Sequence, residues 1–464
     1  MTDGLPLPRR YVAILAISFG TALVVIDGAI ATVALPTIAH DLKVDNSAAV
    51  LVVTVYQLVL VMTLLPFSNL GDRLGLRRLY QYGQLTFTVA TMLCFFAKSL
   101  PFLLVVRAVQ ALGAAAALSV SSALVRSTYP QRHLGRGLGV NSIVVSSAAA
   151  FAPTLGGLVL AVAPWPWVFA SAVPFAILSL LLGRALPDPQ PHDEPFDVLG
   201  AVLCAAMFGL IIAGLESLVH GDSPVISVAI ALGGAAIGVL FVRREIDEPR
   251  PIMPIDLLGQ PVVALSVFGA FTAFVGSMTV ILSLPFRLQH GYGFTPSEVG
   301  AMIAPWPLTT MVVAPLAGAL SDRYPAGLLG SIGMAVAVAG LLTLAWLPPS
   351  PHYGDIAWRM MLTGSGFGLF LSPNARLIIG SSPQRRAAAA GGLISTTRMV
   401  GQTLGATMVA TLLAFGLGSG PAPALVSAGL ALLAGICSAA RLNPALRNPP
   451  REEISGVQPA RQTE

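Results

Sequence analysis

Long windows that carry almost no charge divide this chain, and they constrain its fold more than any single motif. Apolar runs of about 20 residues, enough to cross a bilayer, follow one another between residues 11 and 441. Only 10% of the residues are charged, whereas soluble domains carry about 25%. No segment between the windows is long enough for a soluble catalytic domain. We therefore expect an all-α integral membrane protein, not an enzyme.

The charge-poor windows predict fourteen transmembrane helices. The first window, from Tyr11 to Ile38, is too long for the apolar core of a signal peptide and contains Asp27, so we interpret it as a retained span. The expected spans lie near residues 11–37, 47–68, 80–99, 101–125, 137–162, 165–186, 197–218, 223–242, 261–286, 297–320, 326–348, 356–379, 387–415 and 422–441.

The basic residues predict the orientation. Of the 26 Lys and Arg residues, twenty lie near the ends that would be cytoplasmic if both termini were inside, four lie at outer ends, and Arg107 and Arg398 lie within spans. Cytoplasmic loops of membrane proteins carry this excess. It indicates an even number of spans, both termini in the cytoplasm and a multi-pass protein of the cell (inner) membrane. It also explains the net charge of +5 without a nucleic-acid partner.

An internal repeat predicts the domain organisation. Asp72-Arg73 recurs as Asp322-Arg323, and Arg107 recurs as Arg359, at offsets of 250 and 252 residues. This displacement by eight spans indicates a six-span unit, two extra spans, and the unit again, a layout typical of transporters that rock around a midplane site. We expect an N-terminal six-helix bundle at 1–190, two inserted spans and a linker at 191–256, a C-terminal six-helix bundle at 257–445, and a disordered cytoplasmic tail at 446–464.

Several motifs resemble those of the major facilitator superfamily, and specifically its fourteen-span drug:proton antiporters. The loop after span 2 reads Ser68-Asn-Leu-Gly-Asp72-Arg73-Leu-Gly75-Leu-Arg77-Arg78 and is similar to the superfamily's G-x-L-a-D-R-x-G-R-R, departing at Ser68 and Leu76. The resemblance implies two six-helix bundles in pseudo-twofold arrangement plus two extra central spans. In the loop, a carboxylate can latch one bundle to the other and release it as they rock; the alternative is a basic loop that only sets topology. The gating residues expected here are Asp72, Arg73, Gly75, Arg77, Asp322 and Arg323.

Ala152-Pro153-Thr-Leu-Gly156-Gly157 on span 5 resembles the antiporter signature G-P-x-x-G-G, which is characteristic of exporters. Pro153 bends a helix, and Gly156 and Gly157 allow close packing against a neighbouring helix. The alternative is a packing seam without directional meaning.

Three charged residues within spans are the expected site of proton coupling and substrate binding. Asp27 lies about 24 Å into span 1 and matches an aspartate that binds protons and cationic substrates in the family. Arg107, in a motif resembling R-x-x-Q-G-x-G, either meets a carboxylate or extends to the outer surface, because an intramembrane arginine is costly when unpaired. Arg398 resembles the arginine of R-x-x-G-x-x-x-G in span 13 and is either a charge partner for the site or a structural tie. Other side chains that could line the cavity are Tyr56, Gln57, Asn141, Phe271, Phe274 and Trp306.

The function expected from these features is proton-coupled export of small amphipathic compounds, such as drugs, lipophilic cations or antibiotics, by a monomer in the lipid bilayer. The alternatives are a proton symporter that imports a metabolite and a dedicated exporter of one antibiotic or metabolite. Cys94, Cys204 and Cys437 stand in apolar runs and read as buried, inert thiols. There is no His or Cys pattern of a metal site and no Walker A motif, so we expect no metal, no cofactor and no catalytic residues.

Overall fold

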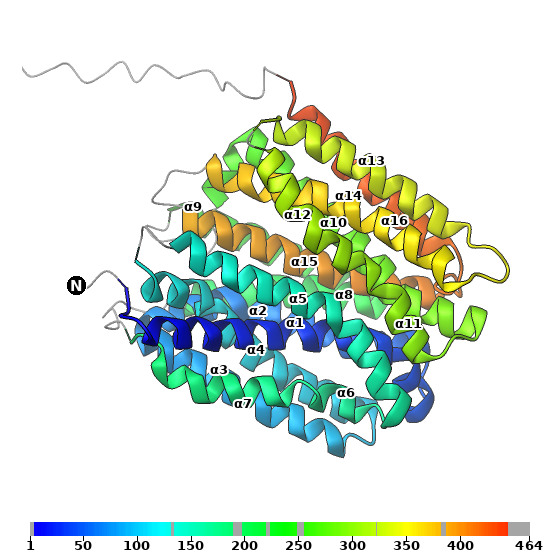
Figure 1. The fold of residues 1–464 in the computed structure, drawn as a ribbon, viewed down its shortest axis with the longest axis horizontal. Coiled ribbons are helices and arrows are strands. Elements are labelled where there is room, and N and C mark those ends of the chain that lie inside the picture. The colour runs from blue at the N-terminus through cyan, green and yellow to red at the C-terminus, as the bar shows by residue number, and fades with distance from the viewer. Residues whose placement is uncertain are drawn as a thin grey trace, which may run out of the picture.

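The computed structural model describes residues 4–130, 134–188, 197–219, 223–247, 255–321, 323–381 and 387–443, and these residues form helices and no strand. The N-terminal bundle and the C-terminal bundle occupy opposite sides of the molecule (Figure 1). The first contains α1 (Arg9–Leu42), α2 (Asn46–Leu74), α3 (Leu76–Leu93), α4 (Leu100–Thr128), α5 (Leu134–Val162), α6 (Pro166–Ala170) and α7 (Val173–Leu182). The second contains α10 (Pro261–Phe286), α11 (Pro296–Ile303), α12 (Pro305–Leu320), α13 (Ala326–Ala345), α14 (Tyr353–Gly380), α15 (Ala387–Ala414) and α16 (Ala422–Ala440).

Proline and glycine set several helix boundaries. Pro305 begins α12 directly after α11, so these two segments form one interrupted rod; a proline has no N–H to donate to the preceding turn. Gly75 joins α2 to α3 with φ of +97°, a backbone conformation that glycine adopts without steric cost. The loop motif therefore needs glycine at this position for the chain to turn.

The membrane character of the fold is confirmed, whereas the number of crossings stays a prediction. If α6 with α7 and α11 with α12 are each taken as one rod, the described residues contain fourteen rods. Ten of these are long and apolar enough to cross a membrane. The chain is thus an all-helical, multi-pass membrane protein.

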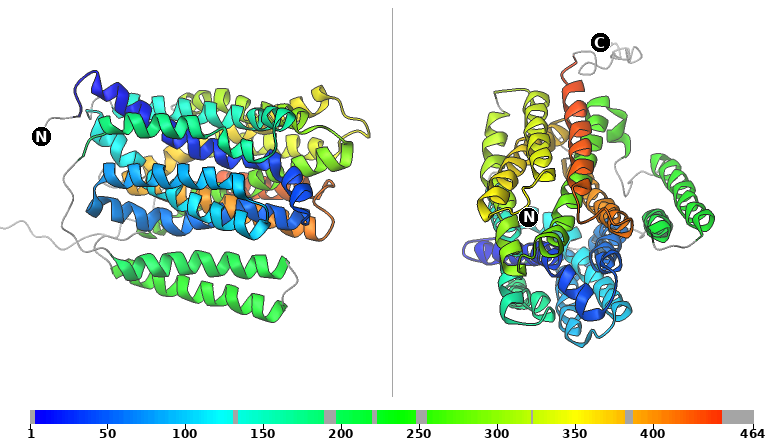
Figure 2. Two further views of the ribbon diagram at one scale, coloured as in Figure 1. Left: turned by 90° about the horizontal axis from the view of Figure 1, so that it is seen from below. Right: turned by 90° about the vertical axis from the view of Figure 1, so that its right-hand side faces the viewer.

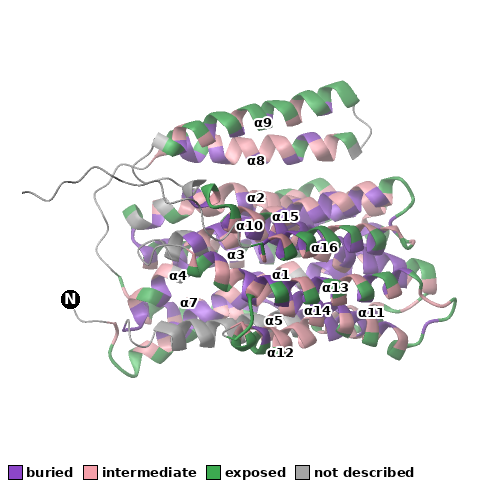
Figure 3. Ribbon diagram, turned by 90° about the horizontal axis from the view of Figure 1, so that it is seen from above, coloured by how far each residue is buried: buried purple, intermediate pink, exposed green. Residues whose placement is uncertain are grey.

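The two inserted helices form a hairpin beside the bundles. α8 (Val198–Val219) and α9 (Pro224–Asp247) pack along each other, and α8 lies against the bundles, where it contacts α2 and α15 (Figure 2). α9 has its outer face exposed (Figure 3). Because α2 and α15 belong to different bundles, α8 lies over the seam between them. An apolar groove of about 360 Å³ remains between α8, α10 and α15, lined among others by Phe208, Phe271 and Leu393.

The bundles touch closely where α5 meets α11. A Cβ at Gly157 would lie 2.6 Å from the Pro296 carbonyl oxygen, and one at Gly300 would lie 2.4 Å from the Pro153 carbonyl oxygen. In the same region the Gln289 amide, after α10, donates to the Val33 carbonyl on α1 at 3.4 Å. The bundles are therefore in direct backbone contact at this end of the molecule.

Candidate functional site

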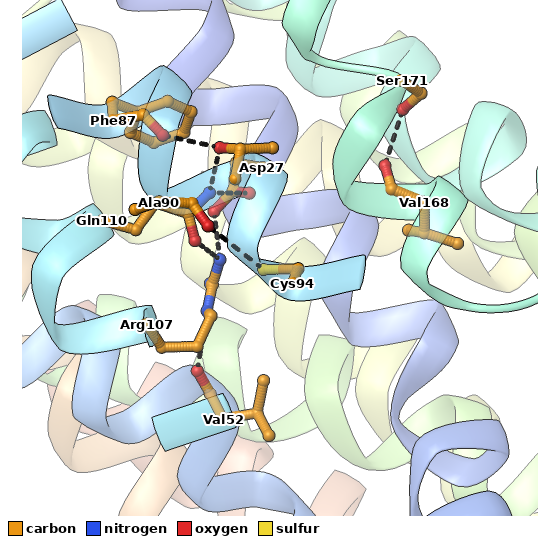
Figure 4. A network of polar contacts seen from close by, with 10 residues as sticks. Asp27, Val52, Phe87, Ala90, Cys94, Arg107, Gln110, Val168 and Ser171 are labelled. Atoms are coloured by element: carbon orange, nitrogen blue, oxygen red, sulfur yellow. Dashed lines mark hydrogen bonds and ion pairs between the residues drawn. The ribbon is translucent and has the colours of Figure 1, made fainter. Parts of the chain in front are cut away.

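Asp27 and Arg107 form an ion pair inside the N-terminal bundle. Arg107 Nη1 on α4 donates to Asp27 Oδ2 on α1 at 2.6 Å, and neither side chain is exposed. The two side chains extend from different helices, and their charged ends meet (Figure 4). Of the two interpretations of Arg107, a carboxylate partner is correct and extension to the outer surface is wrong. The desolvated guanidinium gains more from Asp27 than the long side chain could gain by reaching past the end of α4.

Gln110 completes the coordination of both charged groups. It accepts from Arg107 Nη1 at 2.6 Å through Oε1 and donates to Asp27 Oδ1 at 2.8 Å through Nε2. Its Nε2 also donates to Thr91 Oγ1 on α3 at 2.9 Å. Arg107 Nε in turn donates to the Val52 carbonyl on α2 at 3.1 Å. The network therefore ties four helices, α1 to α4, to a single carboxylate.

The sequence gives only part of this network. Gln110 stands three residues after Arg107, a spacing that places two side chains on one face of a helix, so its part in the site could have been inferred from the motif. Thr91 and the Val52 carbonyl carry no comparable signal. Their roles depend on how α3 and α2 pack against α4.

Two aromatic rings cover the guanidinium of Arg107. Its Cζ lies 4.2 Å from the ring centroid of Tyr56 and 5.0 Å from that of Phe169. Cations are attracted to the faces of aromatic rings, more strongly where water is excluded. Arg107 Nη2 and the Tyr56 hydroxyl are buried without a hydrogen-bond partner in the described part of the chain. Aromatic rings thus surround the pair, and two of the buried polar groups, Arg107 Nη2 and the Tyr56 hydroxyl, can each form a further hydrogen bond.

The repeat counterpart of Arg107 is used differently. Arg359 on α14 donates to the backbone carbonyls of Thr343 and Asp355, and it lies 3.7 Å from the Asp355 carboxylate one turn away on the same helix. It lies at the N-terminal end of α14 and meets no carboxylate from another helix. The two bundles are therefore alike in fold and different in charge placement.

Arg398 on α15 does not join the Asp27 network. Its side chain is half-buried, and no hydrogen bond or ion pair ties it to another described residue. The structural-tie interpretation therefore has no support among the described contacts.

The side chains expected to line a cavity lie in different surroundings. Tyr56 is buried beneath Arg107, and Trp306 is buried with its ring 5.0 Å from that of Phe367. Gln57 is buried with no partner for Oε1 within the described ranges. Phe271 and Phe274 are half-buried on α10, where Phe271 lines the apolar groove and Phe274 packs on Gly401. The side chain of Asn141 lies outside the described residues.

The predicted gating residues are described in part. Arg73 is exposed and Arg77 half-buried, on either side of the turn that Gly75 makes, and Arg323 is exposed after α12. Asp322 and the side chain of Asp72 lie outside the described residues. The latch between bundles therefore stays a prediction.

The α5 motif lies at the contact between the bundles. Pro153 and Gly157 pack against the backbone of α11, while a Cβ at Gly156 would lie 2.8 Å from the Ile30 side chain on α1. Glycine is required at 156 and 157 because any side chain would push the neighbouring helices away. The motif thus forms a close-packed seam between α1, α5 and α11.

Other polar groups contribute to structure. The three cysteines are free and buried, as expected, and no cluster of three metal-binding side chains occurs in the described ranges. Glu298 is exposed and caps α11 through Thr295. Glu216 on α8 accepts a hydrogen bond from Thr407 on α15 at 2.7 Å and thereby joins the hairpin to the C-terminal bundle.

The fold and the motifs agree with a known family of membrane proteins. A family model described as the Major Facilitator Superfamily matches residues 17–406. The chain belongs to this superfamily. Its fold is similar to that of a bacterial homologue of the human lysosomal transporter Spinster, solved inward-facing and unoccupied, with a TM-score of 0.69 and 18% identity over 94% of this chain and 98% of that one.

Related sequences are named as transporters and resistance proteins. The chain is 43% identical to the uncharacterized transporter YebQ of Escherichia coli strain K12, over 95% of this chain and 97% of that protein. It is 28% identical to the riboflavin transporter RibZ of Clostridioides difficile, over 88% and 89% of the two chains. It is 30% identical to the multidrug resistance protein Stp of Mycobacterium tuberculosis, over 87% and 76%. This superfamily member is thus a multi-pass membrane transporter.

Proposed function

We propose that the protein is a proton-coupled antiporter that exports small amphipathic compounds across the cytoplasmic membrane by alternating access. The observation that carries the proposal is the fully buried pair of Asp27 and Arg107 within membrane-spanning helices. Ionisable groups inside a membrane are costly and mark ion and substrate pathways. Protonation of Asp27 would neutralise one member of the pair and leave Arg107 as a buried cation, so binding and release of a proton change the energetics of the surrounding helices.

The ion pair offers a simple means of coupling. When Asp27 is ionised, Arg107 and Gln110 hold α1 and α4 together. A proton on Asp27 removes the attraction and leaves Arg107 its bonds to Gln110 and the Val52 carbonyl. The packing of α1 against α4 would then weaken, and α1 also contacts α10 and α11 of the other bundle. Protonation can thereby bias the two arrangements of the bundles.

The closed end corresponds to one stage of the proposed export cycle. With the cytoplasmic N-terminus that the arginine distribution predicts, the contact between α5 and α11 faces the exterior, and the described arrangement is closed on that side. Substrate would enter from the cytoplasm, and the seam at Gly157 would open to release it. A proton would then bind Asp27 from outside and return with the empty carrier.

Transport by Asp27→Asn in inverted membrane vesicles tests the proposal. A lipophilic cation such as ethidium should accumulate in vesicles with the unaltered protein when respiration acidifies the lumen, and a protonophore should abolish the accumulation. Asp27→Asn should lose it, because asparagine cannot be protonated. Asp41→Asn is the matched control, since Asp41 lies exposed at the end of the same helix.

Near-normal accumulation by Asp27→Asn at matched expression would contradict the proposal. The alternative is that the protein imports its substrate. We consider it because one relative is named as a riboflavin transporter. The same vesicles distinguish the two, because a symporter would move substrate together with protons out of an acidified lumen.

A further inference from the structure

Arg398 lies near the middle of α15, which is one of the expected spans, and no described residue supplies a counter-charge. It stands eleven residues after Ala387, the first residue of α15, or about 17 Å along the helix. No hydrogen bond or ion pair reaches it from the described residues. Among the described residues inside predicted spans, Asp27 is a deep carboxylate and pairs with Arg107. Glu216 lies three residues before the end of α8 and bonds to Thr407, nine residues beyond Arg398.

The neighbours of Arg398 on α15 show which way it faces. Gly401 and Gly405 lie against α10, and Met399 packs in a cluster with residues of α1 and α2. Leu393, Thr396, Thr397 and Val400 line the apolar groove next to α8. At about 100° per residue, Arg398 falls opposite the centre of that groove. It therefore points into the molecule, between α2 and α10.

The helix face that carries Arg398 is polar and partly exposed. Ser395 and Gln402 lie within about 60° of Arg398 around the helix axis, and all three side chains are half-buried. On the opposite bundle, a Cβ at Gly28, next to Asp27, would meet no atom within 4 Å. Open space therefore lies beside Gly28 on α1, and α15 carries a guanidinium, a hydroxyl and an amide on one face.

We infer that Arg398 binds an acidic group of the substrate, so that the preferred cargo is an amphipathic anion. The inference rests on the proposed export function and specifies its substrate class. An arginine inside a membrane is stable only with a counter-charge or other polar partners. Asp27 cannot be that counter-charge because Arg107 and Gln110 occupy both of its oxygens. A sulfonate or carboxylate on the substrate would supply the missing charge, and the guanidinium can donate two parallel hydrogen bonds to it.

The same charge balance argues against a cation as the preferred cargo. With Asp27 ionised, the Asp27–Arg107 pair is neutral, so Arg398 leaves one net positive charge on its face of α15. Glu216 bonds to Thr407, which lies on the opposite face of α15 at about 100° per residue. A lipophilic cation would meet this charge with no free carboxylate to offset it. An exporter that exchanges one proton for one monoanion moves two charges inward per cycle, whereas exchange for a monocation moves none.

A matched pair of fluorescent probes tests the inference. 8-Anilino-1-naphthalenesulfonate and N-phenyl-1-naphthylamine share the same aromatic body, and only the first carries a sulfonate. The purified full-length protein should bind the sulfonate more tightly than the neutral probe. Arg398→Gln should weaken sulfonate binding about 10- to 100-fold, the range for a buried charge-assisted hydrogen bond, and should leave neutral-probe binding unchanged.

Two further variants separate charge recognition from general damage. Arg398→Lys should recover part of the sulfonate affinity because it keeps the charge and loses the planar fork. Arg184→Gln removes one positive charge at an exposed position after α7 and should have no effect. Neutral-probe binding also reports whether each variant is folded.

Transport of the two probe classes in proteoliposomes distinguishes failure of this inference from failure of proton coupling. If protons drive export of tetraphenylphosphonium and the sulfonate is neither bound nor carried, antiport stands and the anion site is wrong. If sulfonate binding depends on Arg398 and its export ignores the proton gradient, the anion site stands and the coupling is wrong. Sulfonate binding that Arg398→Gln leaves unchanged overturns the inference directly.

Discussion

Gly157 on α5 lies directly against Pro296 at the start of α11, so closely that a Cβ on Gly157 would come within 2.6 Å of the Pro296 carbonyl oxygen. This contact joins the N-terminal bundle to the C-terminal bundle through backbone atoms. Backbone cannot move aside as a side chain can. The closed arrangement at this end of the molecule therefore depends on the absence of a side chain at residue 157.

Gly157→Ala should disfavour the closed arrangement. Extra atoms in a well-packed contact cost about 1–3 kcal/mol, which shifts a two-state equilibrium by a factor of about 5 to 150. We expect lower transport rates and faster labelling of a Thr154→Cys reporter by a membrane-impermeant maleimide. The three native cysteines are buried and should not interfere.

Gly233→Ala is the control for this experiment. Gly233 lies on α9, where an added Cβ would meet nothing within 4 Å. The substitution should leave transport and labelling unchanged. Equal effects of the two substitutions would mean that the contact between α5 and α11 does not govern closure.

A double-mutant cycle should reveal the coupling between Asp27 and Arg107. Arg107→Gln leaves the Asp27 carboxylate buried without a cation, and breaking a buried pair costs about 3–5 kcal/mol. The double variant Asp27→Asn/Arg107→Gln removes both charges and should be more stable than Arg107→Gln alone. Thermal unfolding in detergent measures both; additive losses would show that the pair is not a unit.

Asp72→Asn should slow the transport cycle without changing substrate affinity. Asp72 lies near the end of α2, far from a midplane site, so its charge can act only on the equilibrium between conformations. An ion pair at a partly wet interface is worth about 1 kcal/mol or less, enough to change this equilibrium several-fold. The expected result is a lower maximal rate with unchanged affinity in a conformation trapped by crosslinking. A tenfold loss of affinity in the trapped state would contradict the latch.

Asp197 should stabilise the first turn of α8 to an extent that depends on pH. Its carboxylate accepts two hydrogen bonds from Arg244 and one from the Gly200 backbone N–H, and the Arg244 bonds lower the pKa of Asp197 below its usual value. A lowered pKa adds stability above the unfolded-state pKa of about 3.9, and that stability is lost as the pH falls below it. Hydrogen exchange in the first turn of α8 should therefore accelerate under acid conditions.

Two substitutions divide this contribution into its parts. Asp197→Asn keeps an oxygen for the Gly200 N–H and loses the ion pair, worth about 1 kcal/mol or less at a partly exposed site. Asp197→Ala also loses the helix cap, for about 1 kcal/mol more. Faster exchange in the alanine variant than in the asparagine variant is expected. Identical exchange in both would show that Asp197 does not cap α8.

The sequence by itself determined the class of the protein and its internal repeat. Charge-poor windows indicate membrane helices because a bilayer excludes unpaired charge and leaves the backbone no partner but its own helix. Motifs recurring at a constant offset indicate two bundles with an insertion between them. Asp27, Arg107 and Arg398 stood out for the same reason, since a charge within an apolar window needs an explanation.

Only the tertiary structure decided what these charges do. Arg107 and Arg359 are equivalent in the repeat, yet the first meets Asp27 across a helix interface and the second bonds to carbonyls near the end of its helix. The number of residues between Asp27 and Arg107 does not predict their contact, because it depends on how α1 packs against α4. Likewise, Arg441 looked like an ordinary loop arginine, but it is buried and donates to Ser266 and Asn374, so it ties α16 to α10 and α14. Helix formation follows from local sequence, whereas the partner of each polar side chain depends on the packing of helices distant in the chain.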